Sequence, residues 1–275
     1  MSYQEVYKQW CTDPYFSEET RAELKSIEGN EKEIEDRFYK NLEFGTAGLR
    51  GVIGNGTNRM NIYTVRRASQ GLANFIIKEN GQSKGVAIAY DSRHMSPEFC
   101  DEAALCLNAN GIKAYVFPSL RPTPELSFAV RHLGCIAGIV ITASHNPSEY
   151  NGYKVYNEKG CQITEEAALA ITEKIENASY FGKYKPNNSL IKVLDDRVMN
   201  AFLSEVEKLS LFDGTASFAP KIVYTPLNGT GYKPVTEILK RIGVKDLTVV
   251  PEQAYPDGDF PTCPYPKKKP PSDSR

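Results

Sequence analysis

Short apolar segments alternate with helical segments through the middle of the chain. The apolar runs at 85–90, 112–117 and 136–142 have the length of buried strands. We expect helices between them, at 96–111 and 123–134, because a Ser-Pro or Thr-Pro pair opens each segment and a glycine ends it. Strands that alternate with helices in this way are typical of βαβ units. The pattern therefore predicts an α/β fold with a mostly parallel sheet.

The segments before this alternation are helical and then glycine-rich. Residues 17–40 are predicted to be helical, with a serine cap and a break at a Gly-Asn pair. Residues 44–61 contain five glycines in 18 positions, so we expect no regular structure there. A further helix is predicted to begin at the Asn61 cap and to end at Gly81.

A second α/β unit is predicted beyond 178–194, a boundary where Gly, Pro and paired Asn interrupt a segment without a hydrophobic period. A sheet of two strands buries little apolar area and leaves its edges open, so we expect this unit to be incomplete. The remaining expected elements are a short segment at 152–156, helices at 164–177, 195–209 and 232–242, and strands at 221–225 and 247–250.

Composition and charge narrow the function classes. The chain has 33 Lys and Arg against 34 Asp and Glu, whereas a nucleic-acid-binding protein usually carries a basic surface. The apolar stretch at 136–143 is too short to span a membrane, and the N-terminus shows no signal-peptide core. The six cysteines form no CxxC pair and the three histidines are scattered, which disfavours a zinc site. We expect a cytoplasmic protein with reduced cysteines and no nucleic-acid or membrane partner.

The most distinctive polar segment is TASHNPSEYNGYK at 142–154, which directly follows a predicted strand. Since α/β proteins bind ligands at the carboxyl ends of their strands, this segment is a candidate site, and Ser144 is a candidate nucleophile or phosphate carrier. The alternative is a polar turn that ends at an Asn-Pro pair. A hydrolase pair of Ser144 and His145 is disfavoured, because adjacent side chains on an extended chain point to opposite sides and the flanks do not match a nucleophile elbow.

Two arginine-containing segments are candidate anion sites. Arg50 and Arg59 lie in the glycine-rich segment, where guanidinium groups and accessible backbone N–H groups suit a phosphate, although no nucleotide-binding glycine motif is present. The alternative is a flexible connector. In the second segment, Asp91-Ser92-Arg93, the arginine follows a strand and either binds an anion or ties the loop to Asp91.

Two glycine motifs in the second unit carry weaker signals. NGTG at 228–231 lies between a strand and a helix, and we interpret it as a tight left-handed turn rather than as a phosphate loop. DGD at 257–259 lacks the remaining ligands of a 12-residue calcium loop, so calcium binding is rejected.

Taken together, FGTAGLRG at 44–51, YDSR at 90–93, TASHNP at 142–147 and NGYKVY at 151–156 resemble the α-D-phosphohexomutase superfamily. The N-terminal helix and NRMNIYTVRRASQGLA at 58–73 resemble its phosphoglucomutase-2 branch, which includes members with phosphopentomutase activity. The resemblance covers about residues 1–260. It implies a helical extension at 1–42, a domain I at 43–190 with a mixed, mostly parallel sheet sandwiched by helices, and part of a domain II at 195–275.

The resemblance also implies a mechanism. Ser144 would be carried as phosphoserine and would exchange its phosphoryl group with a sugar 1-phosphate and its 6-phosphate or 5-phosphate isomer, through a bisphosphorylated intermediate. Arg50 would hold the phosphate, Lys154 would be the general acid/base, and His145 would orient the transferring group. Asn146 and Arg93 would brace the loop next to the substrate. The implied cofactors are Mg²⁺, bound in part through the phosphate on Ser144, and glucose 1,6-bisphosphate as activator.

The chain departs from the family pattern. Members have four domains and an Asp triplet of the type D-x-D-x-D-R for Mg²⁺, and no such triplet occurs here. From about residue 263 the tail CPYPKKKPPSDSR replaces the expected run, which predicts a truncated or frameshifted gene whose product is inactive alone. The alternative function is that of a non-catalytic fragment that binds sugar phosphates or partners. Hexose or pentose preference and oligomeric state stay open.

Overall fold

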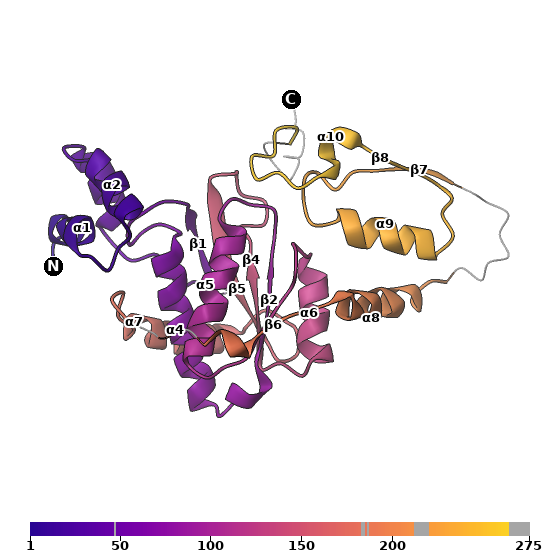
Figure 1. Cartoon of the computed structure of the whole chain (residues 1–275), viewed down its shortest axis with the longest axis horizontal. Coiled ribbons are helices and arrows are strands. Elements are labelled where there is room, and N and C mark those ends of the chain that lie inside the picture. The colour runs from indigo at the N-terminus through magenta and orange to yellow at the C-terminus, as the bar shows by residue number, and fades with distance from the viewer. Residues whose placement is uncertain (47, 183–184, 186, 212–219, 264–275) are drawn as a thin grey trace, which may run out of the picture.

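The computed structural model describes residues 1–46, 48–182, 185, 187–211 and 220–263, so the tail from 264 lies outside the described residues. The centre of the first unit is a six-stranded sheet in the order β1-β5-β4-β2-β3-β6 (Figure 1). β4, β2, β3 and β6 run parallel, whereas β5 is antiparallel to both of its neighbours. The strands are β1 (Gly48–Val52), β2 (Val86–Tyr90), β3 (Ala114–Val116), β4 (Ala137–Ile141), β5 (Tyr150–Asn157) and β6 (Ile191–Val193).

Helices cover both faces of this sheet. Apolar side chains of α4, α5 and α7 pack on one face, and those of α6 pack on the other. The expected mixed, mostly parallel sheet sandwiched by helices is therefore confirmed. These helices are α4 (Ile62–Lys78), α5 (Ser96–Ala109), α6 (Thr123–His132) and α7 (Glu165–Glu176), and short 3₁₀ turns lie at Gln82–Lys84 and Asn188–Leu190.

The glycine-rich segment contains a strand, so the expectation of no regular structure over 44–61 is wrong. β1 pairs antiparallel with β5. The two backbones approach so closely that a Cβ on Gly48, where φ is +139°, would lie 1.8 Å from the carbonyl oxygen of Tyr153. A Cβ on Gly152 would likewise lie 2.6 Å from the carbonyl oxygen of Thr142. These glycines allow the strands to pair, and their frequency alone does not reveal that use.

Three helices form the N-terminal extension: α1 (Tyr3–Thr12), α2 (Glu18–Ser26) and α3 (Glu31–Phe38). The break between α2 and α3 falls at the predicted Gly-Asn pair, and α1 is an additional helix at the indigo end of Figure 1. Trp10 of α1 is 1 % exposed and stacks on Phe16 with ring centroids 4.2 Å apart. Tyr63 of α4 joins the same aromatic cluster, so apolar contacts fix the extension to the first unit.

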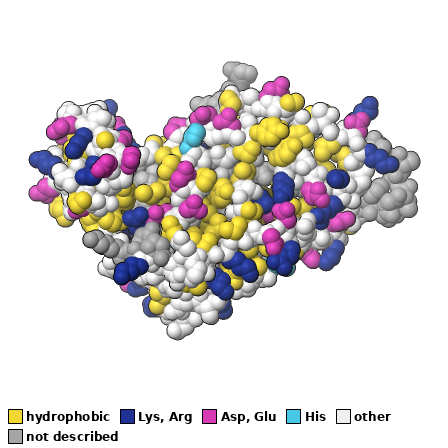
Figure 2. Space-filling view, viewed as in Figure 1, with side chains coloured by type: hydrophobic (Ala, Val, Ile, Leu, Met, Phe, Trp, Pro, Cys, Tyr) yellow, Lys and Arg dark blue, Asp and Glu magenta, His cyan; other side chains and the backbone are white. Residues whose placement is uncertain are grey.

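The second unit is a small α/β arrangement. β7 and β8 are parallel and form the two-stranded sheet that the sequence predicts. Apolar side chains stay exposed on this unit in the region of α10 and β8 (Figure 2), and Val223 and Tyr255 are each more than 70 % exposed. Its elements are α8 (Asp196–Glu207), β7 (Lys221–Tyr224), α9 (Tyr232–Arg241), β8 (Asp246–Val249) and α10 (Pro251–Ala254).

The expected irregular boundary at 178–194 is wrong for its last residues. β6 is an edge strand of the first sheet and pairs with β3, and Leu194 N–H donates to the carbonyl oxygen of Val116 at 2.8 Å. A strand this short is held by backbone pairing at the sheet edge, so it has no side-chain period that a sequence pattern can detect.

Four of the six thiols, all of which are free, are buried: Cys11, Cys100, Cys106 and Cys135. Burial raises the pKa of Cys135 to about 12, which suits a packed, unreactive thiol. Within the described ranges, no helix has the length and apolar character that crossing a membrane requires.

Candidate active site

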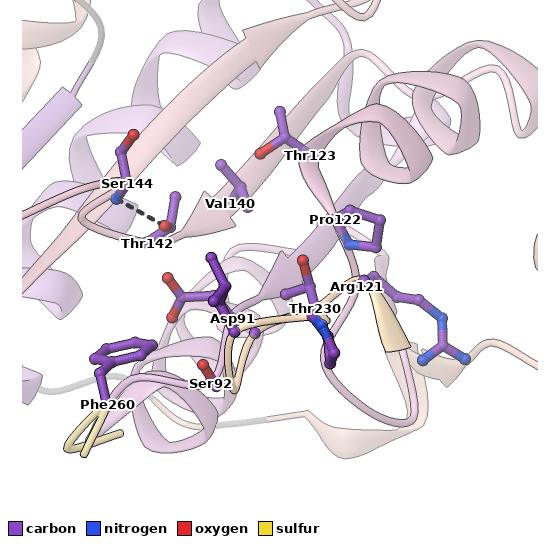
Figure 3. Close-up of a pocket in the computed structure, with 14 residues that line it drawn as sticks. Asp91, Ser92, Arg121, Pro122, Thr123, Val140, Thr142, Ser144, Thr230 and Phe260 are labelled. Carbon is purple, nitrogen blue, oxygen red and sulfur yellow. Dashed lines mark hydrogen bonds between the residues drawn. The ribbon is translucent and has the colours of Figure 1, made fainter. Parts of the chain in front are cut away.

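Ser144 lies in the loop between β4 and β5, just beyond the carboxyl end of β4. Its backbone is left-handed, with φ +58°, and its N–H donates to Thr142 Oγ1 at 2.9 Å (Figure 3). A non-glycine residue in this conformation is strained, so surrounding contacts must hold the loop. The Ser144 side chain is exposed and lines a cavity, where its hydroxyl is accessible to a ligand.

The left-handed backbone at Ser144 also brings His145 beside it. Ser144 Oγ and His145 Nδ1 are 3.3 Å apart, which is within hydrogen-bond distance. The expectation that the two side chains point to opposite sides is therefore wrong, because the chain is not extended here. An imidazole at this distance can orient the serine hydroxyl.

Arg93 binds the backbone of the Ser144 loop. Its guanidinium donates to the carbonyl oxygens of Ser144 (3.2 Å), Asn146 (2.6 Å), Pro147 (2.7 Å) and Tyr150 (3.0 Å). Arg93 is 2 % exposed, and its burial lowers its pKa. Because Nη1 and Nη2 are both engaged by the loop and the side chain is covered, this geometry suits a brace for the loop and does not suit a direct anion ligand.

Asp91 accepts hydrogen bonds within the same turn. Its Oδ1 accepts from Arg93 N–H at 3.0 Å and from the Ser96 hydroxyl at 2.9 Å, and its Oδ2 lies 3.4 Å from Arg93 Nε. Burial raises the pKa of Asp91. Ser96 is the first helical residue of α5 and not its predicted cap; Met95 occupies the cap position, with φ +62°. The serine hydroxyl binds the aspartate in place of capping the helix.

Lys154 projects from the sheet face that carries the cavity. Its neighbours Tyr153 and Val155 belong to the core on the side of α4, and alternate residues of a strand point to opposite faces. Lys154 is paired with Val140 of β4, which lines the same cavity as Ser144. The register therefore brings the lysine to the cavity side of the sheet.

Arg50 shares that face. It is paired with Gly152, two positions before Lys154, whereas its neighbour Leu49 points into the core. Its side chain is exposed. Burial lowers the pKa of Arg93, and the positive charge of Arg50 adds to the effect, so the two guanidinium groups are electrostatic neighbours. Arg50 is thus an accessible cation next to the Ser144 loop.

Arg59, the other arginine of the glycine-rich segment, is engaged elsewhere. It is 8 % exposed and forms an ion pair with Asp36 of α3. It also donates to the backbone oxygens of Asp36 and Asn58. Arg59 therefore ties the glycine-rich segment to the N-terminal extension, and it does not face the Ser144 cavity.

The cavity beside Ser144 lies between the two units and has a volume of about 270 Å³. The first unit lines it with residues that follow β2 and β4 and with the beginning of α6; the second unit lines it with the NGTG loop and Phe260 (Figure 3). Leu227 and Asn228 have φ values of +51° and +56°, which confirms the predicted left-handed turn. The site is thus built from both units.

Sequence reasoning missed Arg121 and Phe260, which are among the residues that line this cavity. Arg121 precedes the Pro-Thr-Pro run that opens α6 at the same sheet edge, and that position was a usable signal. Its Nε lies 3.1 Å from Oε1 of the fully buried Glu125, and burial raises the pKa of Glu125 to about 7. Phe260 comes from the other unit, and no local pattern predicts its position.

The described residues do not form a metal site beside Ser144. Asp91 is the one carboxylate among the described residues that line the cavity, and both of its oxygens already contact Arg93. In the part of the chain that the structure describes, no group of three His, Cys, Asp or Glu side chains could hold a metal ion. The described residues therefore lack the carboxylate cluster that the implied Mg²⁺ would need beside the phosphate on Ser144.

Models of one enzyme family match both units. The model described as phosphoglucomutase/phosphomannomutase, alpha/beta/alpha domain I matches residues 41–181, and that of alpha/beta/alpha domain II matches residues 200–274. The chain belongs to the phosphoglucomutase/phosphomannomutase family. The first match includes the Ser144 loop, and the expected membership of the α-D-phosphohexomutase superfamily is confirmed. The assignment to the phosphoglucomutase-2 branch stays a prediction.

Curated family members match across most of this chain. A phosphoglucomutase from Staphylococcus saprophyticus is 39 % identical over 240 residues, which is 84 % of this chain and 43 % of that protein. A phosphoglucomutase from Staphylococcus haemolyticus is 37 % identical over 232 residues, or 82 % of this chain and 42 % of that protein. The chain therefore spans less than half the length of these relatives.

A solved structure supports the same fold. The structure from Thermus thermophilus that is described as a candidate phosphomannomutase superposes with a TM-score of 0.68 at 26 % identity. The match covers 80 % of this chain and 48 % of that one. The α/β arrangement of this family member is thus shared over most of this chain.

Proposed function

We propose that Ser144 carries a phosphoryl group and exchanges it with a sugar phosphate, as the first unit of a phosphoglucomutase-type enzyme. The observation that supports this most directly is the strained Ser144 loop, which presents an exposed hydroxyl to a cavity and is held by four hydrogen bonds from Arg93. A rigid nucleophile at the mouth of a cavity is what phosphoryl transfer requires, since that reaction depends on positioning and charge neutralisation.

In the proposed step, the bond between Ser144 Oγ and phosphorus breaks while a bond forms between phosphorus and a sugar hydroxyl oxygen. The proton that the hydroxyl loses goes to the amine of Lys154, which passes it to the departing Ser144 Oγ. The product is a sugar bisphosphate. After it turns over in the cavity, its other phosphoryl group passes to Ser144. In this step Lys154 takes the proton of the Ser144 hydroxyl and gives it to the sugar oxygen that leaves. The sum is a sugar 1-phosphate converted to its 6-phosphate or 5-phosphate isomer, or the reverse.

The remaining site residues have supporting roles in this proposal. Arg50 neutralises the phosphate with its exposed guanidinium, and His145 orients the Ser144 hydroxyl from 3.3 Å. Arg93 and Asn146 keep the loop in place beside the substrate. Among the described residues, we assign a Mg²⁺ ligand only to Ser144, through its phosphate. We propose sugar phosphates as the substrates, glucose 1,6-bisphosphate as the activator and the cytoplasm as the compartment.

The test is direct phosphorylation. Purified chain incubated with glucose 1,6-bisphosphate should gain the mass of one phosphate, and peptide mapping should assign it to Ser144. Ser144→Ala should gain none, whereas Ser92→Ala should label normally, because Ser92 lines the same cavity but lies in a different loop. Label that maps consistently elsewhere, with Ser144 bare, would refute the proposal.

A second candidate is a sugar-phosphate-binding protein without turnover. It is favoured by the described residues, whose carboxylates form no metal cluster near Ser144. A coupled assay on glucose 1-phosphate with Mg²⁺ and bisphosphate separates the candidates. We expect phosphorylation of Ser144 with no measurable mutase turnover by the 275-residue chain. Robust magnesium-dependent turnover would contradict this.

A further inference from the structure

A turn of the second unit packs against the arginine that holds the Ser144 loop. The ring centroid of Phe260 lies 5.3 Å from the guanidinium carbon of Arg93. Phe260 is 6 % exposed, although Asp259 beside it is exposed. An aromatic ring over a guanidinium group is most attractive where water is excluded, and Arg93 is itself 2 % exposed.

Nη1 and Nη2 of the same guanidinium donate to the loop. The hydrogen bonds from Arg93 to the carbonyl oxygens of Ser144 and Asn146 are 3.2 Å and 2.6 Å long. Water that reached this guanidinium would compete for its donors, since hydrogen bonds strengthen in a dry environment. Phe260 therefore acts on the loop through Arg93.

The neighbours of Phe260 hold it against the first unit. Asp259 Oδ1 lies 2.7 Å from His94 Nε2. A Cβ on Gly258 would lie 3.0 Å from the backbone nitrogen of His94, so the absence of a side chain at this position permits the close approach. Two adjacent residues of the turn thus contact the residue next to Arg93.

The turn is also joined to the NGTG loop. The backbone carbonyl oxygen of Asn228 accepts a hydrogen bond from Asp257 N–H at 3.2 Å. The side-chain amide of Asn228 donates to the carbonyl oxygen of Tyr255 at 3.0 Å. Phe260 itself has φ +49°, a left-handed conformation that a phenylalanine keeps only when its surroundings impose it. The second unit therefore holds the ring in position at a cost in backbone strain.

We propose that Phe260 is a positioning residue for Ser144: the second unit fixes the geometry of the Ser144 loop by covering Arg93 with this ring. The catalytic consequence rests on the proposed function of Ser144 as a phosphoryl carrier. The structural consequence, a loop whose order depends on Phe260, does not rest on it, and the two can be measured separately.

The first measurement is hydrogen exchange in the full chain. The amides of Ser144, Asn146 and Tyr150 are hydrogen-bonded within the loop and report its opening. Phe260→Ala should raise their exchange roughly tenfold, as the loss of a desolvated cation–π contact implies. Tyr255→Ala is the matched control, because Tyr255 is 74 % exposed in the same segment, and it should leave loop exchange unchanged.

The second measurement is the rate of Ser144 phosphorylation by glucose 1,6-bisphosphate. Phe260→Ala should slow it about tenfold at saturation with the half-saturating concentration unchanged, and Phe260→Tyr should restore it because the ring is kept. If wild-type Ser144 accepts no phosphate, the proposed function fails while the exchange result still decides the positioning role. Loop exchange in Phe260→Ala equal to that of wild type overturns the positioning role.

A further variant guards against misfolding. If Phe260→Ala also exchanges rapidly in β2, the second unit or the core has been disrupted, and Gly258→Ala then decides. That substitution keeps the ring but puts a Cβ 3.0 Å from the backbone nitrogen of His94, so the contact between the turn and His94 must loosen by a few tenths of an ångström. Exchange in the loop should then rise while β2 stays protected. Loop exchange equal to wild type in Gly258→Ala would overturn the proposal.

Discussion

Arg93 Nη2 donates a hydrogen bond to the carbonyl oxygen of Ser144 at 3.2 Å, although the two residues follow different strands. β2 and β4 are parallel neighbours, so their carboxyl ends lie at one edge of the sheet and the side chain beyond one strand reaches the loop beyond the other. Two segments that are about fifty residues apart in the sequence thereby form one structure. The two arginines at the site differ in role, because Arg93 is buried in contact with the loop and Arg50 is exposed.

Arg93→Ala should mainly lower stability, whereas Arg50→Ala should mainly lower the rate of Ser144 phosphorylation. Arg93→Ala removes a buried donor from four carbonyl oxygens of the loop and the start of β5, so we expect the free energy of unfolding to fall by about 3 kcal/mol. Arg50→Ala should change it by less than about 0.5 kcal/mol and yet slow the phosphorylation of Ser144. Urea unfolding and intact-mass kinetics measure the two effects. Equal losses of stability would contradict the assignment of Arg93 as the brace.

Gly48→Ala should prevent the close pairing of β1 with β5. The added Cβ would lie 1.8 Å from the carbonyl oxygen of Tyr153, so we expect a loss of at least about 3 kcal/mol in the free energy of unfolding. Gly111→Ala is the control, because Gly111 has φ +74° but no atom within 4 Å of the new Cβ; backbone strain alone should cost about 1 kcal/mol. Similar denaturation midpoints for the two variants would show that β1 can shift to accommodate the added Cβ at little cost in stability.

The sequence predicts those elements whose own residues determine them. β2, β4 and α6 follow from apolar runs, a Thr-Pro pair and terminal glycines, and the structure has them within a few residues of the expected ends. β1 was missed because its glycines serve the approach of a strand that lies about a hundred residues further along the chain. Local propensity contains no information about such a partner.

Some features of the candidate site could likewise be predicted from the sequence and others could not. The loop after β4 was predicted because ligands bind where strands end, and the residues of that loop are contiguous. The proximity of Ser144 and His145 was not predicted, because it depends on a left-handed φ at Ser144 that hydrogen bonds from Arg93 hold in place. Phe260 was missed because its place depends on how the two units pack together.

Lys154→Met and Lys159→Met test the general acid/base. Lys154 lies on the cavity face of β5, whereas Lys159 is exposed in the turn from Asn157 to Gly160. We expect Lys154→Met to slow phosphoryl transfer between Ser144 and glucose 1,6-bisphosphate by roughly 10²–10⁴-fold. Lys159→Met should leave the rate near that of wild type, and stability should change by less than about 0.5 kcal/mol. If Lys159→Met is the slow variant, the acid/base assignment is wrong.

Glu125 should make the stability of the chain depend on pH. The carboxyl group is fully buried beside Arg121, and one of its oxygens has no hydrogen-bond partner among the described residues. Burial raises the pKa of Glu125 from its ordinary value of 4.5 to about 7, and attraction to Arg121 opposes only part of this rise. Between these two values the unfolded chain has lost the proton that the folded chain retains.

The sign of the effect follows from that difference. Since the folded state binds more protons between pH 4.5 and about 7, the free energy of unfolding should fall as the pH rises through this window, by about 3 kcal/mol, and then level off. Glu125→Gln removes the titrating group. The difference in the free energy of unfolding between wild type and this variant should therefore show the pH dependence that Glu125 causes. Urea unfolding at intervals of half a pH unit measures it, with the exposed Glu98→Gln as a control. A wild-type advantage over Glu125→Gln that grows with pH would show that Arg121 dominates and that Glu125 is ionised in the fold.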